Sequence, residues 1–189
     1  MIGIRRMIVI GILALPAFNA ASFAVKAVSV DKFRIHNQIT GWTEDKGSYQ
    51  SFGPKELFDL LDGGAPEYID NGMKEGFFQR LKGPDSATIE LYAEDFGSDK
   101  NAKKMVAVKQ SNSSDAPAAA VSDSSTFILR EVIGGFWACG SAGRYYFELT
   151  LMGIKDDAKA KAEIKKYFDY YRNTAEGQLK SGRGMRAPS

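Results

Sequence analysis

Two hydrophobic periods alternate along this chain of 189 residues. Apolar residues recur at every second position in some segments, which is typical of strands. In others they recur at spacings of three and four, which is typical of amphipathic helices. The predicted strands cover residues 28–35, 76–82, 87–96, 127–133, 136–140 and 144–152. The predicted helices cover residues 54–61, 66–71, 98–110 and 156–172.

Short turns connect most of the predicted strands. Gly83-Pro84-Asp85 lies between the predicted strands over residues 76–82 and 87–96. Gly134-Gly135 and Ser141-Ala142-Gly143 separate the last three predicted strands. Connections this short join antiparallel neighbours, because a parallel crossover needs a dozen or more residues. We therefore predict an α+β fold, with an antiparallel β-sheet of about five to six strands and helices packed on it.

The stretch PKELFDLLDGGAPEYIDNG, from Pro54 to Gly72, combines helix formers with helix breakers. Pro54 suits the first position of a helix, where its missing N–H has no partner to lose. Pro66 divides the stretch into two short helices, and Gly72 is placed to close the second as a left-handed cap. The stretch also contains five carboxylates, at Glu56, Asp59, Asp62, Glu67 and Asp70.

The N-terminus has the features of an export signal. Arg5 and Arg6 precede an uncharged apolar run over residues 7–15, and residues 22–24 fit the small-x-small cleavage rule, with residues 20–22 as a near alternative. An uncleaved membrane anchor is the competing interpretation. Polar residues and a proline interrupt the run before it reaches the roughly 20 apolar residues of a membrane span. We therefore expect a cleavable signal over residues 1–24.

This signal predicts the location of the protein. No cysteine lies near the cleavage site, so the chain is not expected to be a lipoprotein. The pattern after Arg5-Arg6 does not fit a twin-arginine signal, which favours the general secretory route. We predict a periplasmic or secreted protein with no stable membrane span after cleavage. Residues 25–173 form a single predicted domain, with an exposed loop over residues 111–125, and residues 174–189 are predicted to be a disordered tail.

The net charge excludes one class of partner. The chain has 25 basic and 23 acidic residues, but the two extra arginines belong to the signal, so the mature chain is neutral. A neutral chain gives no electrostatic basis for binding nucleic acid or an anionic membrane. We therefore predict no nucleic-acid partner.

Candidate catalytic residues are few. His36 is the only histidine and Cys139 the only cysteine, so zinc sites built on several histidines and internal disulfides are excluded. His36 is predicted to be an ordinary surface or edge-strand residue. Cys139 lies within a predicted strand with no activating neighbour, so we expect a buried thiol. We predict no metal ion, no cofactor and no catalytic residue.

The acidic, glycine-containing stretch gives the only candidate site. Paired carboxylates can act as acid and base or bind a hard cation, although the spacing here does not match a calcium loop. Gly63-Gly64 lacks the lysine of a phosphate-binding loop, so close packing of the helix is the preferred explanation for the glycines. The candidate binding residues are Asp62, Gly63, Gly64, Glu67 and Tyr68.

The same residues carry a resemblance to a known family. Gly41-Trp42, Leu61-Asp62-Gly63-Gly64-Ala65, Tyr68 and Gly72 resemble the Gly-Trp … Ile/Leu-Asp-Gly-Gly-Ala … Tyr … Gly signature of a family of exported bacterial proteins. That family is catalogued only as a domain of unknown function, so no activity comes with the resemblance. This chain has Pro66 where the family tends to have a glutamate. In shape we expect a likeness to PsbP-like domains, which does not establish function.

These observations predict a non-enzymatic domain of the cell envelope that binds an unidentified protein or small molecule. The alternative is an envelope enzyme that uses Asp62 and Glu67, with or without a divalent cation. A purely structural assembly factor is a third hypothesis.

Overall fold

The computed structural model describes residues 30–61, 63–112 and 127–183, with side chains described as far as Gly177. The predicted signal, most of the predicted loop over residues 111–125, Asp62 and residues 184–189 lie outside the described residues.

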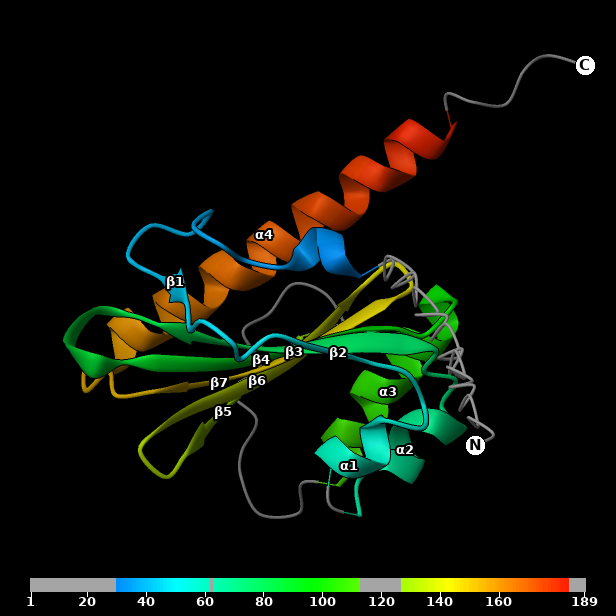
Figure 1. The fold of residues 1–189 in the computed structure, drawn as a ribbon, viewed down its shortest axis with the longest axis horizontal. Coiled ribbons are helices and arrows are strands. Elements are labelled where there is room, and N and C mark those ends of the chain that lie inside the picture. Colours follow the sequence, from blue (N-terminus) through cyan, green and yellow to red (C-terminus); the bar gives the residue numbers. More distant parts are fainter. Residues whose placement is uncertain (1–29, 62, 113–126, 184–189) are drawn as a thin grey trace, which may run out of the picture.

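An antiparallel sheet lies at the centre of the described part of the chain (Figure 1). Its seven strands are β1 (Thr43–Glu44), β2 (Gln50–Phe52), β3 (Glu75–Lys82), β4 (Thr88–Asp95), β5 (Phe127–Val132), β6 (Gly135–Ala142) and β7 (Tyr145–Met152). They follow the order β1-β3-β4-β7-β6-β5, and β2 also pairs with β3. The predicted α+β class is confirmed, and the likeness to PsbP-like domains stays a prediction.

Helices cover both faces of this sheet (Figure 1). One face carries α4 (Asp157–Arg183) and the short 3₁₀ turn η1 (Asp31–Phe33). The other face carries α1 (Leu57–Leu60), α2 (Ala65–Asp70) and α3 (Asp99–Ser111). Side chains that alternate along the central strands therefore point into one of two buried layers.

The predicted strand over residues 28–35 is wrong in its described part, which contains η1. Val30, Phe33 and Ile35 are buried against the α4 face, so their apolar character reflects burial and not strand pairing. The backbone of Ile35 pairs with a side chain: its N–H donates to Gln79 Oε1 at 3.0 Å, and its carbonyl accepts from Gln79 Nε2 at 2.6 Å. A buried amide thus satisfies both groups without a neighbouring strand.

The two predicted groups of antiparallel strands are confirmed. The turn between β3 and β4 places Asp85 and Ser86 at φ angles of 53° and 64°, in the left-handed region that non-glycine residues rarely adopt. The connection between β5 and β6 is Ile133-Gly134, with Gly134 at φ 81°. The chain here reverses one residue earlier than predicted.

The predicted split helix is confirmed, and α1 is shorter than expected. Residues 54–56 form turns, so α1 contains only four residues. Gly72 has the predicted left-handed conformation, with φ 92°, and its N–H donates to the carbonyl of Ile69 at 2.9 Å. This cap ends α2 and directs the chain into β3.

Helix α3 has the predicted cap and buried stripe. Ser98 Oγ accepts from the N–H of Asn101 at 3.2 Å, and Ala102, Met105 and Val106 are buried. Helix α4 starts as predicted but continues to Arg183, so residues 174–183 of the predicted disordered tail are helical. Ala175 is 3% exposed in the core, which gives the helix a reason to continue beyond residue 172.

Candidate functional site

The structure places four of the five predicted binding residues. Asp62 lies outside the described residues. Gly63 is exposed between α1 and α2 with φ 73°, and a Cβ built there would meet nothing within 4 Å. Gly64 precedes α2, where an added Cβ would make only an ordinary contact of 3.6 Å. The expected close packing at these glycines is therefore wrong: Gly63 is favoured by its left-handed backbone.

Other side chains approach a glycine closely at Gly76 of β3. A Cβ there would lie 2.6 Å from the ring of Phe52 and 2.8 Å from Cγ of Glu94. The space beside Gly76 is therefore filled by the side chains of Phe52 and of its cross-strand partner Glu94.

Glu67 connects α2 to α3. Its Oε1 lies 2.8 Å from Nζ of Lys109, and its Oε2 accepts from Nδ2 of Asn112 at 2.7 Å. The two ion-pair partners are partly buried, with 20% of the lysine side chain and 28% of the glutamate side chain exposed. Both oxygens of Glu67 are thus held by α3.

Tyr68 connects α2 to the sheet. Its ring is buried at 5% exposure, and its hydroxyl donates to Oε2 of Glu148 at 2.9 Å. Lys109 Nζ lies 4.5 Å from the centre of the Tyr68 ring, a cation–π distance. Burial raises the pKa of Tyr68, and the negative charge of Glu148 raises it further, so the hydroxyl stays a donor.

Glu148 of β7 is the centre of this layer. Besides Tyr68, Tyr146 donates its hydroxyl to Oε2 at 2.8 Å, and Trp137 donates Nε1–H to Oε1 at 2.8 Å. An ionised carboxylate accepts hydrogen bonds and donates none, so three donors suit its charged form. These bonds connect β6, β7 and α2 through one carboxylate.

Glu94 of β4 is a second carboxyl group in the same layer. Its residue is fully buried, and neither carboxyl oxygen has a hydrogen-bond partner among the described residues. Glu94 pairs with Tyr146 across the β4–β7 ladder, while Glu148 pairs with Tyr92, so the two glutamates are diagonal neighbours on one face. Burial raises the pKa of Glu94 well above its usual value, and the charge of Glu148 adds to this effect.

Sequence reasoning missed Glu94 and Glu148 as possible functional residues. The number of helices in the sequence could have indicated that both faces of the sheet are covered. One helix follows the last strand and three precede the last three strands, so both faces of the sheet have helices to cover them. Acidic residues that alternate with tyrosine near the middle of a helix-covered sheet face can therefore become partly or fully buried, as Glu148 and Glu94 are.

The two residues that could have served as nucleophile or base have the predicted surroundings. Cys139 is buried in β6, and burial raises the pKa of its thiol to about 12, so the thiolate is disfavoured. His36 is exposed, with Nδ1 3.1 Å from Oε2 of Glu44. The two residues therefore have different surroundings: Cys139 lies in a buried layer, and His36 contacts a carboxylate at the surface.

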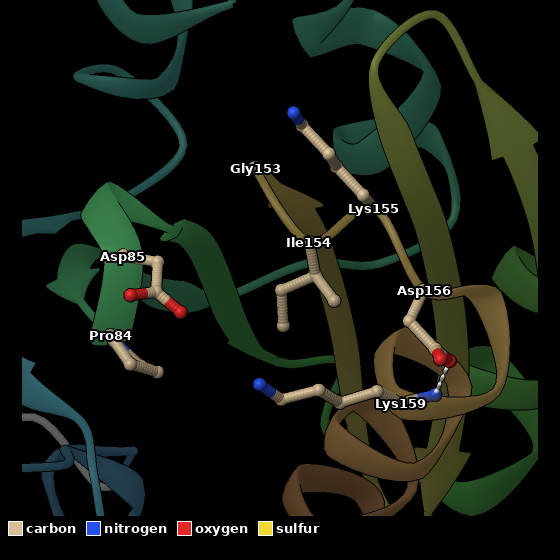
Figure 2. Close-up of a pocket in the computed structure, with 7 residues that line it drawn as sticks. All are labelled: Pro84, Asp85, Gly153, Ile154, Lys155, Asp156 and Lys159. Carbon is tan, nitrogen blue, oxygen red and sulfur yellow. Dashed lines mark hydrogen bonds between the residues drawn. The ribbon is translucent and has the colours of Figure 1, made fainter.

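An open pocket lies at the other end of β3 from α2, where the β3–β4 turn meets the start of α4 (Figure 2). Its volume is about 410 Å³. It is lined by Pro84, Asp85, Gly153, Ile154, Lys155, Asp156 and Lys159. Figure 2 shows Lys159 extending from α4 toward Pro84, while Asp156 turns back to accept from the N–H of Lys159 at 2.8 Å. None of the predicted site residues contributes to this pocket.

The described residues contain no group of three or more His, Cys, Asp and Glu side chains arranged to hold a metal ion. Within the same ranges, no helix has both the length and the apolar character needed to cross a membrane.

Comparison with protein-family models gives no match for this chain, and comparison with curated proteins gives none either. One solved structure with a related arrangement is the extracellular domain of PknH from Mycobacterium tuberculosis. The identity is 13%, the TM-score is 0.45, and the match covers 72% of this chain and 81% of that chain. This similarity carries no ligand or activity over to the present chain.

Proposed function

We propose that this chain is an exported, non-catalytic, single-domain protein that binds a small charged ligand in the pocket beside the start of α4. Export is supported by the sequence of residues 1–24, and the resemblance to a family of exported bacterial proteins agrees with it. The observation that carries the proposal is the set of charged side chains around the pocket that have no partner among the residues that the structure describes.

Three charged groups at the pocket, on Asp85, Lys155 and Lys159, form no side-chain hydrogen bond or ion pair with the described residues. Elsewhere the surface pairs many of its charges, for example Arg80 with Glu90 at 2.6 Å. The pocket volume falls within the range of about 300–1,000 Å³ that is common for small-molecule sites.

The lining defines the kind of ligand. The two lysines supply positive charge, while Ile154 and Pro84 supply apolar surface. Asp85 adds an acceptor on the opposite side. A small anion that also carries an ammonium or hydroxyl donor complements this arrangement. Asp156 already caps the first turn of α4, so the lysine side chains, and not the free end of the helix, supply the positive charge.

The turn that carries Asp85 has an unusual backbone. Asp85 and Ser86 both have positive φ, which costs free energy for non-glycine residues, and such positions are concentrated at ligand sites. This conformation places the Asp85 side chain at the pocket (Figure 2). The strained turn therefore gives independent support for a binding role.

The alternative, an envelope enzyme that uses Asp62 and Glu67 with a divalent cation, has less support. Both oxygens of Glu67 are already held by Lys109 and Asn112. A cation at Glu67 would have to displace the partly buried ammonium group of Lys109. Breaking this ion pair costs free energy, because it leaves a partly desolvated charge without its partner.

The test is calorimetric titration of the mature chain with phosphate, small carboxylates and amino acids, repeated with Lys155→Ala/Lys159→Ala. We expect binding of at least one anionic compound and a loss of at least tenfold in affinity in the double variant. The matched control is Lys165→Ala/Lys166→Ala, which removes the same charge from α4 outside the pocket lining. Equal losses in both double variants, or no binding by the wild type, would overturn the proposal.

A further inference from the structure

Glu94 lies where an unpaired charge is most costly. It has no exposed surface, and its side chain and the ring of Phe52 together fill the space beside Gly76. Neither oxygen has a hydrogen-bond partner among the described residues. A buried carboxyl group without donors is far more stable when protonated than when ionised.

Several other titratable groups face Glu94 or share its layer. Each comes from an element that packs on this part of the sheet: Glu67 and Tyr68 from α2, Lys109 from α3, Tyr92 from β4, Cys139 from β6, and Tyr146 and Glu148 from β7. Glu148 disfavours a negative charge on Glu94, and Lys109 favours one. The ammonium group of Lys109 lies 2.8 Å from Glu67, so its charge is shared with a closer carboxylate.

The layer therefore contains two carboxyl groups with opposite surroundings. Glu148 has three donors, on Tyr68, Tyr146 and Trp137, and is built to hold a negative charge. Glu94 has none. One of the three donors, Tyr68, belongs to α2, so the attachment of α2 to the sheet depends on the carboxyl pair that lies beneath it.

We propose that Glu94 is a proton-operated latch: its protonated form keeps α2 docked on the sheet, and loss of the proton to solvent releases α2. Ionisation leaves two negative charges side by side under α2. Opening α2 relieves this repulsion, because water then reaches both carboxylates.

Helix α2 can open more easily than α3, the long helix of this layer. It has only six residues, and among them only Ala65 and Tyr68 are buried. Helices this short are not stable alone and depend on tertiary contacts. Local opening generally involves elements with few buried apolar contacts. The flanking Gly63 and Gly72 both have positive φ and mark the two ends of the segment.

Hydrogen exchange with mass spectrometry tests this latch. Peptides covering residues 63–72 of the wild type are followed from pH 5 to pH 9, with correction for the intrinsic pH dependence of exchange. We expect their protection to fall with pH, by up to about tenfold per pH unit, since release is linked to one proton. Peptides from α4 serve as an internal reference and should change less.

Two variants separate the latch from a general effect of pH. Glu94→Gln keeps the shape and removes the proton, so residues 63–72 should stay protected across the range. Glu90→Gln changes a half-exposed glutamate on the same strand and face, and should behave as wild type. A wild-type protection that does not change with pH, or a pH dependence that survives in Glu94→Gln, would overturn the proposal. The wild-type result is decisive even where a variant does not fold.

Discussion

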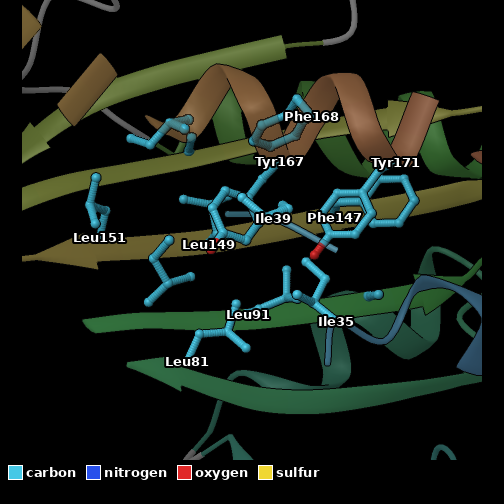
Figure 3. Packing of buried hydrophobic residues seen from close by; sticks show 14 of the residues in the cluster. Ile35, Ile39, Leu81, Leu91, Phe147, Leu149, Leu151, Tyr167, Phe168 and Tyr171 are labelled. Atoms are coloured by element: carbon cyan, nitrogen blue, oxygen red, sulfur yellow. The ribbon is translucent and has the colours of Figure 1, made fainter. Parts of the chain in front are cut away.

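The two faces of the sheet bury different kinds of side chain beneath their helices. On the α4 face most buried side chains are apolar or aromatic, and Phe147 stacks on Tyr171 with ring centres 4.4 Å apart and an angle of 8° between them (Figure 3). The buried polar residues of the strands on this face, Gln79 and Asp95, are paired with the Ile35 backbone and with Arg144. On the α1–α3 face the layer contains the fully buried Glu94, which has no hydrogen-bond partner among the described residues, and the partly buried Glu148. Apolar burial stabilises at every pH, whereas buried carboxyls make stability depend on pH.

The two faces of the sheet have different roles within one domain. The α4 face forms the larger core and also anchors the N-terminal segment through Phe33, whose ring lies 4.8 Å from that of Phe147. The α1–α3 face has shorter helices and a polar layer that specifies one arrangement through hydrogen bonds. We infer that the first face provides stability and that the second provides the movable part.

The largest expected effect is on the α4 face. Phe147→Ala removes a ring that is 1% exposed and contacts both Phe33 and Tyr171, and it should lower the free energy of unfolding by about 3–5 kcal/mol. Urea denaturation measures this. The control is Phe58→Ala, at a site that is 56% exposed, where a change within about 0.5 kcal/mol is expected. Similar losses at the two sites would contradict the assignment of the main core.

A smaller effect is expected on the other face. Tyr68→Phe keeps the ring and removes one of the three donors to Glu148, so it should lower the free energy of unfolding by about 1.5–3 kcal/mol. Tyr170→Phe is the matched control, because its hydroxyl donates a long bond of 3.5 Å to the carbonyl of Lys32 and has no carboxylate acceptor in the hydrogen bonds of the described residues. A loss no greater than that of the control would show that Tyr68 does not hold α2 through Glu148.

The smallest effect is expected at the link between α2 and α3. Lys109→Met removes a partly buried ion pair with Glu67 and should lower the free energy of unfolding by about 0.5–1 kcal/mol, less at high salt. Lys103→Met is the control on the same helix, where the pair with Asp99 is exposed on both sides. If both variants lose the same amount, the partial burial of the Glu67 pair has no energetic consequence.

The sequence predicted the fold better than the site, for a physical reason. Strand alternation and glycine turns are local signals, and they located β3 to β7 and the ends of α2 and α3. The strand predicted over residues 28–35 was wrong because a segment can be apolar through burial alone, without pairing with a strand. At Ile35 the side chain of Gln79, and not a neighbouring strand, pairs with the backbone. The length of α4 depended on the burial of Ala175.

The site depended on contacts between distant parts of the chain. Tyr68 and Glu148 are 80 positions apart, and Glu67 and Asn112 are 45 apart. No local pattern shows that these side chains meet. The acids of residues 54–72 are clustered in sequence, yet the buried acids of the described residues are Glu94 and Asp95, which lie in β4. Burial on a doubly covered sheet, and not clustering, identifies the unusual carboxyl group.

The claim that the α1–α3 face makes stability depend on pH is tested most directly by the free energy of unfolding of wild type and Glu94→Gln. It is measured by urea denaturation between pH 5 and pH 8. Burial raises the pKa of Glu94 in the folded chain above its unfolded value. Its stabilising contribution is therefore complete below pH about 4.5 and declines as the pH rises toward the folded value. The advantage of Glu94→Gln over wild type should grow with pH, by up to about 1.4 kcal/mol per unit. A difference between the two proteins that stays constant from pH 5 to pH 8 would contradict the account.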